Sequence, residues 1–289
     1  MKIGNIDINS VKIGNTTVNK VYIGADQVFP NEALLLDSLT ASSSYSLRKL
    51  RTLYTGYAIK VRRASDNNEQ NIGFLNNQLD TTTLNTFCSG TNGFVTTWYD
   101  QSGNANNAIQ TTATRQPKIY DSTSGVLLRN SKPSMQFSSA QWLISPNSSS
   151  LNVTDGSGND FPINIFSVYD LNGSTGGIIS KDDGGSSREF FLGFFSSKLR
   201  FFVKQNGGGT QISKDNFNTT QNNFNLMSAF YDGSKNVSGF TMFQDGSAAT
   251  LGNTVGSTIT GIANTSANLY IGTYCLLYTS DAADDTPCV

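Results

Sequence analysis

The chain alternates apolar and polar residues over many short segments that end in glycine, asparagine or aspartate. A period of two is typical of strands with one buried face. Many short strands separated by turns indicate an all-β antiparallel sandwich or barrel. The pattern predicts strands at 57–63, 94–99, 134–137, 163–169, 189–195, 199–203, 226–231, 240–243 and 269–271.

A shorter repeat occupies the N-terminal segment, residues 1–30. Ile3-Gly4, Ile13-Gly14 and Ile23-Gly24 recur every ten residues (13 − 3 = 10 and 23 − 13 = 10). Each unit alternates before a glycine turn, which predicts successive short strands in a small β-meander. Such a meander is marginal alone, so we expect it to pack on a neighbour, on copies of itself or on a larger assembly. An ordinary strand pair of the main sandwich is the alternative.

The remaining chain is predicted to be one sandwich domain, residues 31–273, with one or two short helices. The period changes over 42–51, which predicts a helix there, and a second helical turn or two is expected over 81–88. Asp232-Gly233 and Asp245-Gly246 predict tight hairpin turns, since glycine accepts a positive φ. Residues 274–289 lose this texture and are predicted to be a non-native or disordered acidic tail.

Composition and charge exclude several classes of function. The sequence is 14% charged with 27 Gly and 18 Phe, and its net charge of −1 offers no positive field for nucleic acid or an anionic membrane. No apolar run approaches the ~20 residues of a membrane span. The N-terminus lacks the apolar region of a classical signal peptide, so synthesis in the cytoplasm is expected.

The count of chemically active residues narrows the reactions further. The absence of His excludes a Ser-His-Asp triad and a His-based metal site. Three widely spaced cysteines do not predict a disulfide framework. We expect no metal and no cofactor. Residues 155–160 have the oxygen-rich look of a calcium loop but lack its full ligand spacing, so a solvent loop is favoured.

Several strings occur in a familiar order, namely Tyr45-Ser-Leu-Arg48, Tyr54-Thr-Gly-Tyr-Ala58, Val61-Arg-Arg-Ala-Ser-Asp66 and above all Trp98-Tyr-Asp-Gln-Ser-Gly-Asn104. Over about residues 35–120 the chain resembles the catalytic domain of α-L-arabinofuranosidase B. The resemblance implies a concanavalin A-like jelly-roll sandwich that recognises glycans or cell-surface polysaccharide. The N-terminal repeats are similar to leader segments of phage tail and other virion proteins that carry this domain. This similarity implies a virion or extracellular location after release and other virion proteins as partners. Packing of the repeat on copies of itself would give a homo-oligomer.

Departures from the family shape the expected activity. The resemblance implies a retaining glycosidase, which needs two carboxylates roughly 5 Å apart. The stretch 203–207 that matches the family nucleophile has no carboxylate, and Thr273 and Tyr274 follow Gly272 where the acid/base is expected. Gly93 replaces the disulfide partner that the resemblance implies for Cys88. A carbohydrate-recognising module without hydrolysis is therefore predicted, and an active retaining α-L-arabinofuranosidase is the alternative.

Seven residues remain as site candidates. Glu189 is the candidate for a displaced nucleophile, with Asp182 or Asp183 on the preceding loop as its partner; a strand-edge charge beside Arg188 is the favoured alternative. The ligand-binding candidates are Trp142, Asp100, Gln101 and Asn206. A turn formed by Asp100 and its neighbours is the favoured alternative for that motif. Trp98 is expected in the core, and Trp142 is expected to be the freer of the two tryptophans.

Overall fold

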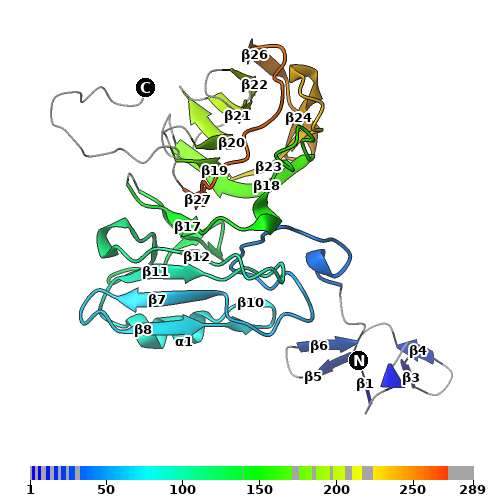
Figure 1. The fold of residues 1–289 in the computed structure, drawn as a ribbon. Coiled ribbons are helices and arrows are strands. Elements are labelled where there is room, and N and C mark those ends of the chain that lie inside the picture. The colour runs from blue at the N-terminus through cyan, green and yellow to red at the C-terminus, as the bar shows by residue number, and fades with distance from the viewer. Residues whose placement is uncertain are drawn as a thin grey trace. The chain divides into compact units, whose positions relative to one another are not determined.

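The computed structural model shows an antiparallel all-β chain that packs as two compact units (Figure 1). Unit 1 comprises residues 1–105 and 118–135, and unit 2 comprises 106–117 and 136–289. The structure describes residues 33–138, 140–170, 176–183, 187–195, 198–205, 210–216 and 224–272, together with the backbone of six short strands before residue 30. Asn206 and the predicted tail at 274–289 lie outside the described residues. No helix in these ranges is long and apolar enough to cross a bilayer.

The six N-terminal strands pair two by two. They are β1 (Lys2–Ile3) with β2 (Ile6–Asp7), β3 (Val11–Ile13) with β4 (Thr16–Val18), and β5 (Val21–Ile23) with β6 (Asp26–Phe29). Ile3 pairs with Ile6, Ile13 with Thr16 and Ile23 with Asp26, so each repeated isoleucine ends the first strand of a hairpin. The ten-residue repeat therefore corresponds to one hairpin. In the described backbone these hairpins pair within themselves, which differs from the expected continuous meander.

Unit 1 contains a sheet with the strand order β14-β13-β11-β7-β8. Its strands are β7 (Ile59–Arg63), β8 (Glu69–Ile72), β11 (Gly93–Trp98), β13 (Lys118–Asp121) and β14 (Gly125–Val126). Helix α1 (Thr81–Cys88) begins at the cap Asp80 and confirms the prediction for 81–88. Short elements complete the unit: η1 (Leu35–Asp37) and the hairpins β9 (Phe74–Leu75) with β10 (Gln78–Leu79) and β15 (Leu128–Arg129) with β16 (Lys132–Pro133).

The core of unit 1 follows the predicted period of two. Ile59 and Val61 are fully buried on one face of β7, whereas Lys60 and Arg62 share the half-buried face. Val95 of β11 lies opposite Val61, and Leu84 of α1 is also fully buried. Apolar residues of the central strands and of the helix therefore form one continuous interior.

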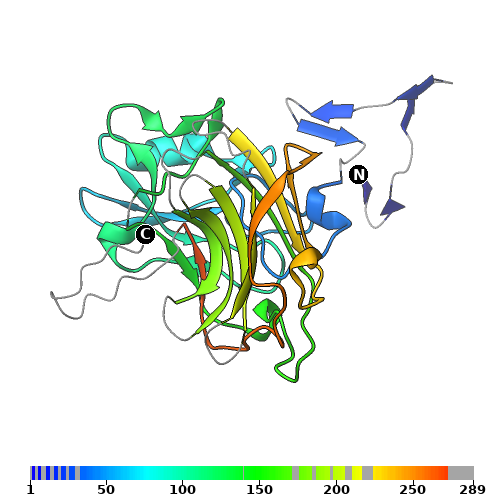
Figure 2. The same ribbon diagram turned by 90° about the horizontal axis from the view of Figure 1, so that it is seen from above.

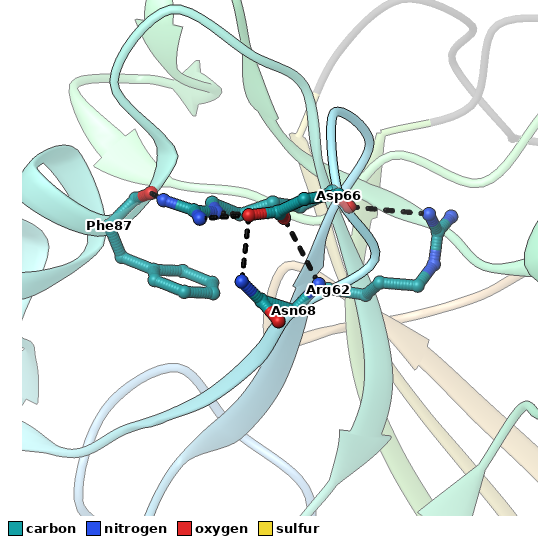
Figure 3. A network of polar contacts seen from close by, with 5 residues as sticks. Arg62, Asp66, Asn68 and Phe87 are labelled. Carbon is teal, nitrogen blue, oxygen red and sulfur yellow. Dashed lines mark hydrogen bonds and ion pairs between the residues drawn. The ribbon is translucent and has the colours of Figure 1, made fainter.

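A polar network closes the turn between β7 and β8 and joins it to α1 (Figure 3). Asp66 pairs with Arg63 and accepts the backbone N–H of Asn68 at 3.1 Å. Arg63 donates to the carbonyl of Phe87 at 3.3 Å and lies 5.0 Å from that ring. The Val61–Asp66 string thus fixes a turn in this fold.

Unit 2 contains two sheets that face each other (Figure 2). The larger has the order β12 (Ala108–Ile109), β17 (Leu143–Ser145), β27 (Leu269–Ile271), β19 (Gly176–Asp182), β20 (Arg188–Phe195), β21 (Lys198–Lys204), β22 (Gln211–Asn216) and β26 (Leu251–Val255). The smaller has the order β18 (Ile163–Asp170), β23 (Phe224–Tyr231), β24 (Phe240–Gln244) and β25 (Ser247–Ala248). The helical turns η2 (Ala113–Arg115), η3 (Ser149–Leu151) and η4 (Val237–Gly239) lie between strands.

Aromatic side chains fill the space between these two sheets. Tyr169 of β18 meets Phe194 of β20 with ring centroids 5.2 Å apart, and Phe201 of β21 meets Phe240 of β24 at 5.1 Å. Edge-to-face contacts of this kind add to the free energy of apolar burial. The predicted all-β sandwich is confirmed.

The strands predicted from 163 onward are present, whereas one predicted strand and one predicted turn are corrected. Residues 134–137 form no strand, because the chain there follows the short β16 in an irregular path. Asp245-Gly246 joins β24 to β25 as a tight hairpin with φ of 51° and 80°. Asp232-Gly233 instead opens the longer connection that contains η4, where Asp232 accepts the N–H of Ser234 at 2.8 Å.

Candidate functional site

The three acidic candidates lie where β19 meets β20. Lys181 pairs with Phe190 and Asp182 with Arg188, so Glu189 between them has no partner residue and forms a β-bulge. Its side chain makes an ion pair with Lys181 at 2.9 Å, and both side chains are 0% exposed. Glu189 is therefore a buried ion-pair residue, which corrects the expectation of a strand-edge charge beside Arg188.

The second oxygen of Glu189 is also occupied. Oε1 accepts the backbone N–H and the hydroxyl of Thr265, each at 2.9 Å. These bonds tie the segment before β27 to the bulge of β20. The carboxylate has one cation and two donors around it, and these partners offset part of the cost of holding a charge in the interior.

Asp182 belongs to β19 itself, whereas the sequence placed it on a loop. Both of its oxygens lie 2.8 Å from Nε of Arg188, and the Asp182 side chain is fully buried. The Arg188 guanidinium also lies 5.7 Å from the ring centroid of Phe202. Burial, followed by the nearby charge of Arg188, lowers the pKa of Lys204. Asp183 follows directly, and its backbone N–H donates to Ser187 at 3.2 Å.

The Asp100 and Gln101 side chains bind the main chain of residues 44–50. Asp100 accepts the N–H of Ser44 at 2.8 Å and also binds Ser102. Gln101 is fully buried; it accepts the N–H of Leu50 at 2.8 Å and donates to the carbonyls of Ser46 and Arg48. We call these two residues and their bonds the Asp-Gln clamp. The Asp100 contacts agree with the turn interpretation, and Gln101 has a structural position that the sequence did not predict.

The helix predicted over 42–51 was wrong, and the Asp-Gln clamp supplies the reason. The segment is extended and irregular, apart from an isolated bridge at Arg48. A helix would need the N–H groups and carbonyls of this segment for its own i to i−4 bonds. Side chains from residues 100 and 101, far away in sequence, take those groups instead.

The two tryptophans differ from their expected exposure. Trp142 is only 6% exposed, with the Arg115 guanidinium 4.4 Å from its ring centroid, because the η2 turn covers it. Trp98 is half-buried and lies 5.7 Å from the Tyr45 ring. The expectation that Trp142 is the freer ring was wrong.

The 155–160 loop is held by its own amide groups. Asp155 accepts the N–H groups of Ser157 and Asn159 and the Asn159 side-chain amide at 2.6 Å. These donors surround the carboxylate that a calcium ion would need. Within the described ranges, no group of three or more acidic or cysteine side chains could hold a metal.

A surface that sequence reasoning missed lies on the half-buried face of β7 and β8. Tyr57 is 49% exposed and its ring lies 6.3 Å from Tyr99. The Tyr99 hydroxyl donates to Asn71 at 2.7 Å, and Lys60 lies 3.4 Å from Glu69. We call these five residues the tyrosine face. Such a face combines flat rings with amide and charged groups, the side-chain types that can stack on and hydrogen-bond a sugar. The sequence did contain a sign of this surface, because Lys60 and Arg62 alternate with apolar residues and so share one face of β7.

The implied disulfide position is visible in the structure. Cys88 is buried at the end of α1, and burial raises the pKa of its thiol to about 11. A Cβ atom placed on Gly93 would lie 2.7 Å from the Cys88 sulfur. A side chain at position 93 would therefore crowd the Cys88 sulfur as long as Cys88 keeps a free thiol.

Comparisons with known proteins concern the same region. Residues 39–127 match the family model described as "Alpha-L-arabinofuranosidase B, catalytic". A sequence search of curated proteins gave no match. An arabinofuranosidase complexed with arabinofuranosyl-α-1,2-xylobiose is similar in structure, with a TM-score of 0.50 and 14% identity over 81% of this chain and 57% of the other.

Two further solved structures are family 54 α-L-arabinofuranosidases. One was soaked with a cyclic sulfate inhibitor (TM-score 0.49, 12% identity, 81% of this chain and 55% of that chain). The other is a glutamate-to-glutamine mutant soaked with 4-nitrophenyl α-L-arabinofuranoside (0.48, 13%, 83% and 56%). The chain spans little more than half the length of these enzymes. Residues 39–127 thus resemble the catalytic domain of arabinofuranosidase B, and the fold of the chain is arabinofuranosidase-like.

Proposed function

We propose that this chain is a carbohydrate-recognising module that does not hydrolyse its ligand. The observation that carries the proposal is that two of the three nominated carboxylates, Glu189 and Asp182, are buried in ion pairs. A retaining glycosidase presents two carboxyl groups about 5 to 5.5 Å apart to the sugar, one as nucleophile and one as acid/base. Glu189 uses Oε1 for Thr265 and Oε2 for Lys181, so neither oxygen faces a substrate.

The family match and the fold support a carbohydrate as the ligand class. The tyrosine face lies within the matched residues 39–127 and exposes the Tyr57 ring. We infer that this face contacts the sugar, with Tyr57 stacking on a ring and Asn71 and Lys60 close enough to bind hydroxyls. Arabinose-containing polysaccharides are the first ligands to test.

Affinity electrophoresis in gels containing arabinan or arabinoxylan tests recognition. We expect the full chain to be retarded and Tyr57→Ala to lose about tenfold in affinity, which corresponds to 1.4 kcal/mol. Phe161→Ala is the matched control, because Phe161 is an aromatic residue of similar exposure (43%) in unit 2. Failure of a wide glycan array to retain the chain would refute recognition, and equal loss in both variants would refute the assignment to the tyrosine face.

Turnover of an aryl α-L-arabinofuranoside tests the absence of hydrolysis. We expect no release of the aryl group by the full chain. Turnover that disappears in Glu189→Gln and survives in Asp232→Asn would overturn the proposal. Since Glu189→Gln leaves Lys181 unpaired, the double variant Lys181→Met/Glu189→Gln provides a folded comparison without the orphaned charge.

An active retaining α-L-arabinofuranosidase is the second candidate function. The observation in its favour is that the matched family model describes a catalytic domain. The same assay separates the two, because only this candidate requires turnover.

We also propose that the N-terminal hairpins attach the chain to a virion, where it meets other virion proteins. Three short hairpins in tandem support this role, because none has enough apolar surface to be stable alone. Mass spectrometry of purified phage particles from the source culture should detect peptides of the chain. Peptides found only in the soluble lysate would contradict virion attachment.

A further inference from the structure

We propose that two copies of this chain associate by pairing their β18 strands edge to edge, around a two-fold axis at Ser167. β18 is an eight-residue strand, and in the described part of the chain it pairs with β23 alone (Figure 1). No described strand pairs with its other side, which carries alternate N–H and C=O groups between Ile163 and Tyr169. The chemically matched occupant of such an edge is another strand.

The sequence of β18 lacks the features that keep edge strands apart. Proteins protect edges with lysine, proline, bulges or short strands. β18 reads Ile-Asn-Ile-Phe-Ser-Val-Tyr-Asp, pairs with β23 in unbroken register from Ile163 to Asp170, and has its one charge at the last residue. Nothing in this strand repels an identical strand in antiparallel orientation.

The inward face of β18 indicates where the axis lies. Ser167 alternates with Ile165 and Tyr169, and its hydroxyl is buried without a hydrogen-bond partner in the described residues. A buried hydroxyl without a partner is costly and calls for explanation. A two-fold axis at Ser167 places this residue opposite its own copy, where residues on one face come within about 5 Å. Each Ser167 then supplies the partner that the other lacks.

The outward face matches the same register. Phe166 and Val168 are 66% and 64% exposed, and Phe166 lies 5.5 Å from the Phe230 ring. An axis at Ser167 sets Phe166 of one copy opposite Val168 of the other, and the reverse. Aromatic and β-branched residues form favourable cross-strand pairs. The two apolar exposures of β18 therefore cover each other.

The size of the contact predicts a weak dimer. An axis at Ser167 pairs the seven residues 164–170 of each copy, which at about 3.3 Å each give a paired edge of about 23 Å. Such an edge buries on the order of a few hundred Å² per copy, below the size of stable interfaces. We expect reversible association in the micromolar range.

Sedimentation velocity of the full chain from about 1 to about 200 µM tests the proposal. We expect a concentration-dependent dimer that Phe166→Lys and Val168→Lys each weaken at least about tenfold. Leu226→Lys is the matched control, because Leu226 is 47% exposed on the same sheet but lies on β23, away from the edge. A monomer at every concentration, or equal weakening by Leu226→Lys, overturns edge pairing.

Cysteine cross-linking tests the register. In a Cys275→Ser/Cys288→Ser background, mixing Phe166→Cys with Val168→Cys should give a disulfide-linked dimer, and Phe166→Cys alone should not. The reverse result would overturn the axis at Ser167. Unchanged thermal unfolding of each variant shows that the fold is intact.

Discussion

Replacing Gln101 with Ala should destabilise unit 1 more than any other single polar truncation in the Asp-Gln clamp. The change removes one acceptor from Leu50 and one donor each from Ser46 and Arg48. The Leu50 bond is buried, so its orphaned N–H costs about 1 to 3 kcal/mol. The two carbonyls are part-buried and lose about 1 kcal/mol each. The expected loss is about 3 to 5 kcal/mol, a large share of the roughly 5 to 15 kcal/mol that stabilises a typical domain.

The distribution of tryptophans allows unit 1 to be followed separately. Trp98 lies in unit 1 and Trp142 in unit 2, and the sequence has only these two. In a Trp142→Phe background, fluorescence during urea unfolding reports unit 1. Gln101→Ala should move the midpoint to lower urea without changing the slope. Gln70→Ala is the control, because Gln70 is exposed on β8 and should shift the free energy by less than about 0.5 kcal/mol.

A loss below about 1 kcal/mol for Gln101→Ala would refute this reasoning. It would mean that water replaces the lost bonds, and that residues 44–50 are held by other contacts.

Three further predictions concern unit 1. Gly93→Cys should form a disulfide with Cys88 and raise the unfolding free energy by about 2 kcal/mol for so short a loop. A Cys88 thiol that still reacts, or no loss of stability on reduction, would contradict this prediction. The control Gly93→Ala should only destabilise the fold, because its Cβ crowds the Cys88 sulfur. Burial raises the pKa of the Cys88 thiol from 9.0 to about 11, so the neutral thiol stabilises the fold fully below pH 9. This stabilisation is lost as the pH rises from 9 towards 11, and the loss is about 3 kcal/mol at about 1.36 kcal/mol per pH unit. Cys88→Ala should flatten the dependence of the unfolding free energy on pH between pH 9 and 10, and an unchanged dependence would show that Cys88 does not cause it. Asp80 caps α1 by accepting hydrogen bonds from Thr83, and these bonds lower the pKa of Asp80 from 3.8. Asp80→Ala should therefore lower the unfolding free energy by about 1 kcal/mol at pH 7 and by progressively less below pH 4. Asp80→Asn, which keeps an acceptor, should lower it less, and an equal loss for Asp80→Ala at pH 3 would argue against a charged cap.

The sequence predicted those elements that depend on local pattern. The strand 163–169 was found almost to the residue, and the helical turn or two predicted over 81–88 corresponds to α1. A period of two reports burial on one face of a sheet, and this signal needs no knowledge of the tertiary structure.

The failures at the candidate site residues involve partners distant in sequence. The segment 42–51 looks helical until residues 100 and 101 take its backbone groups. Glu189 looks like a surface charge until a bulge brings it against Lys181 and Thr265. Trp142 looks exposed in the sequence, but the turn that carries Arg115 covers its ring. A pattern read within a short stretch of sequence cannot predict these contacts, because the partners lie elsewhere in the chain.

The interleaved connectivity of the two units has a consequence for synthesis on the ribosome. Unit 1 is built from 1–105 and 118–135, while the intervening 106–117 belongs to unit 2. Strand β13, which begins at Lys118, is hydrogen-bonded to β11, so the first unit stays incomplete until the later stretch emerges. The twelve residues 106–117, which belong to unit 2, meanwhile have no partners until the chain from residue 136 onward has been made (117 − 106 + 1 = 12). A nascent chain halted near residue 110 should therefore be sensitive to proteases across its whole length, whereas one released after residue 272 should resist them.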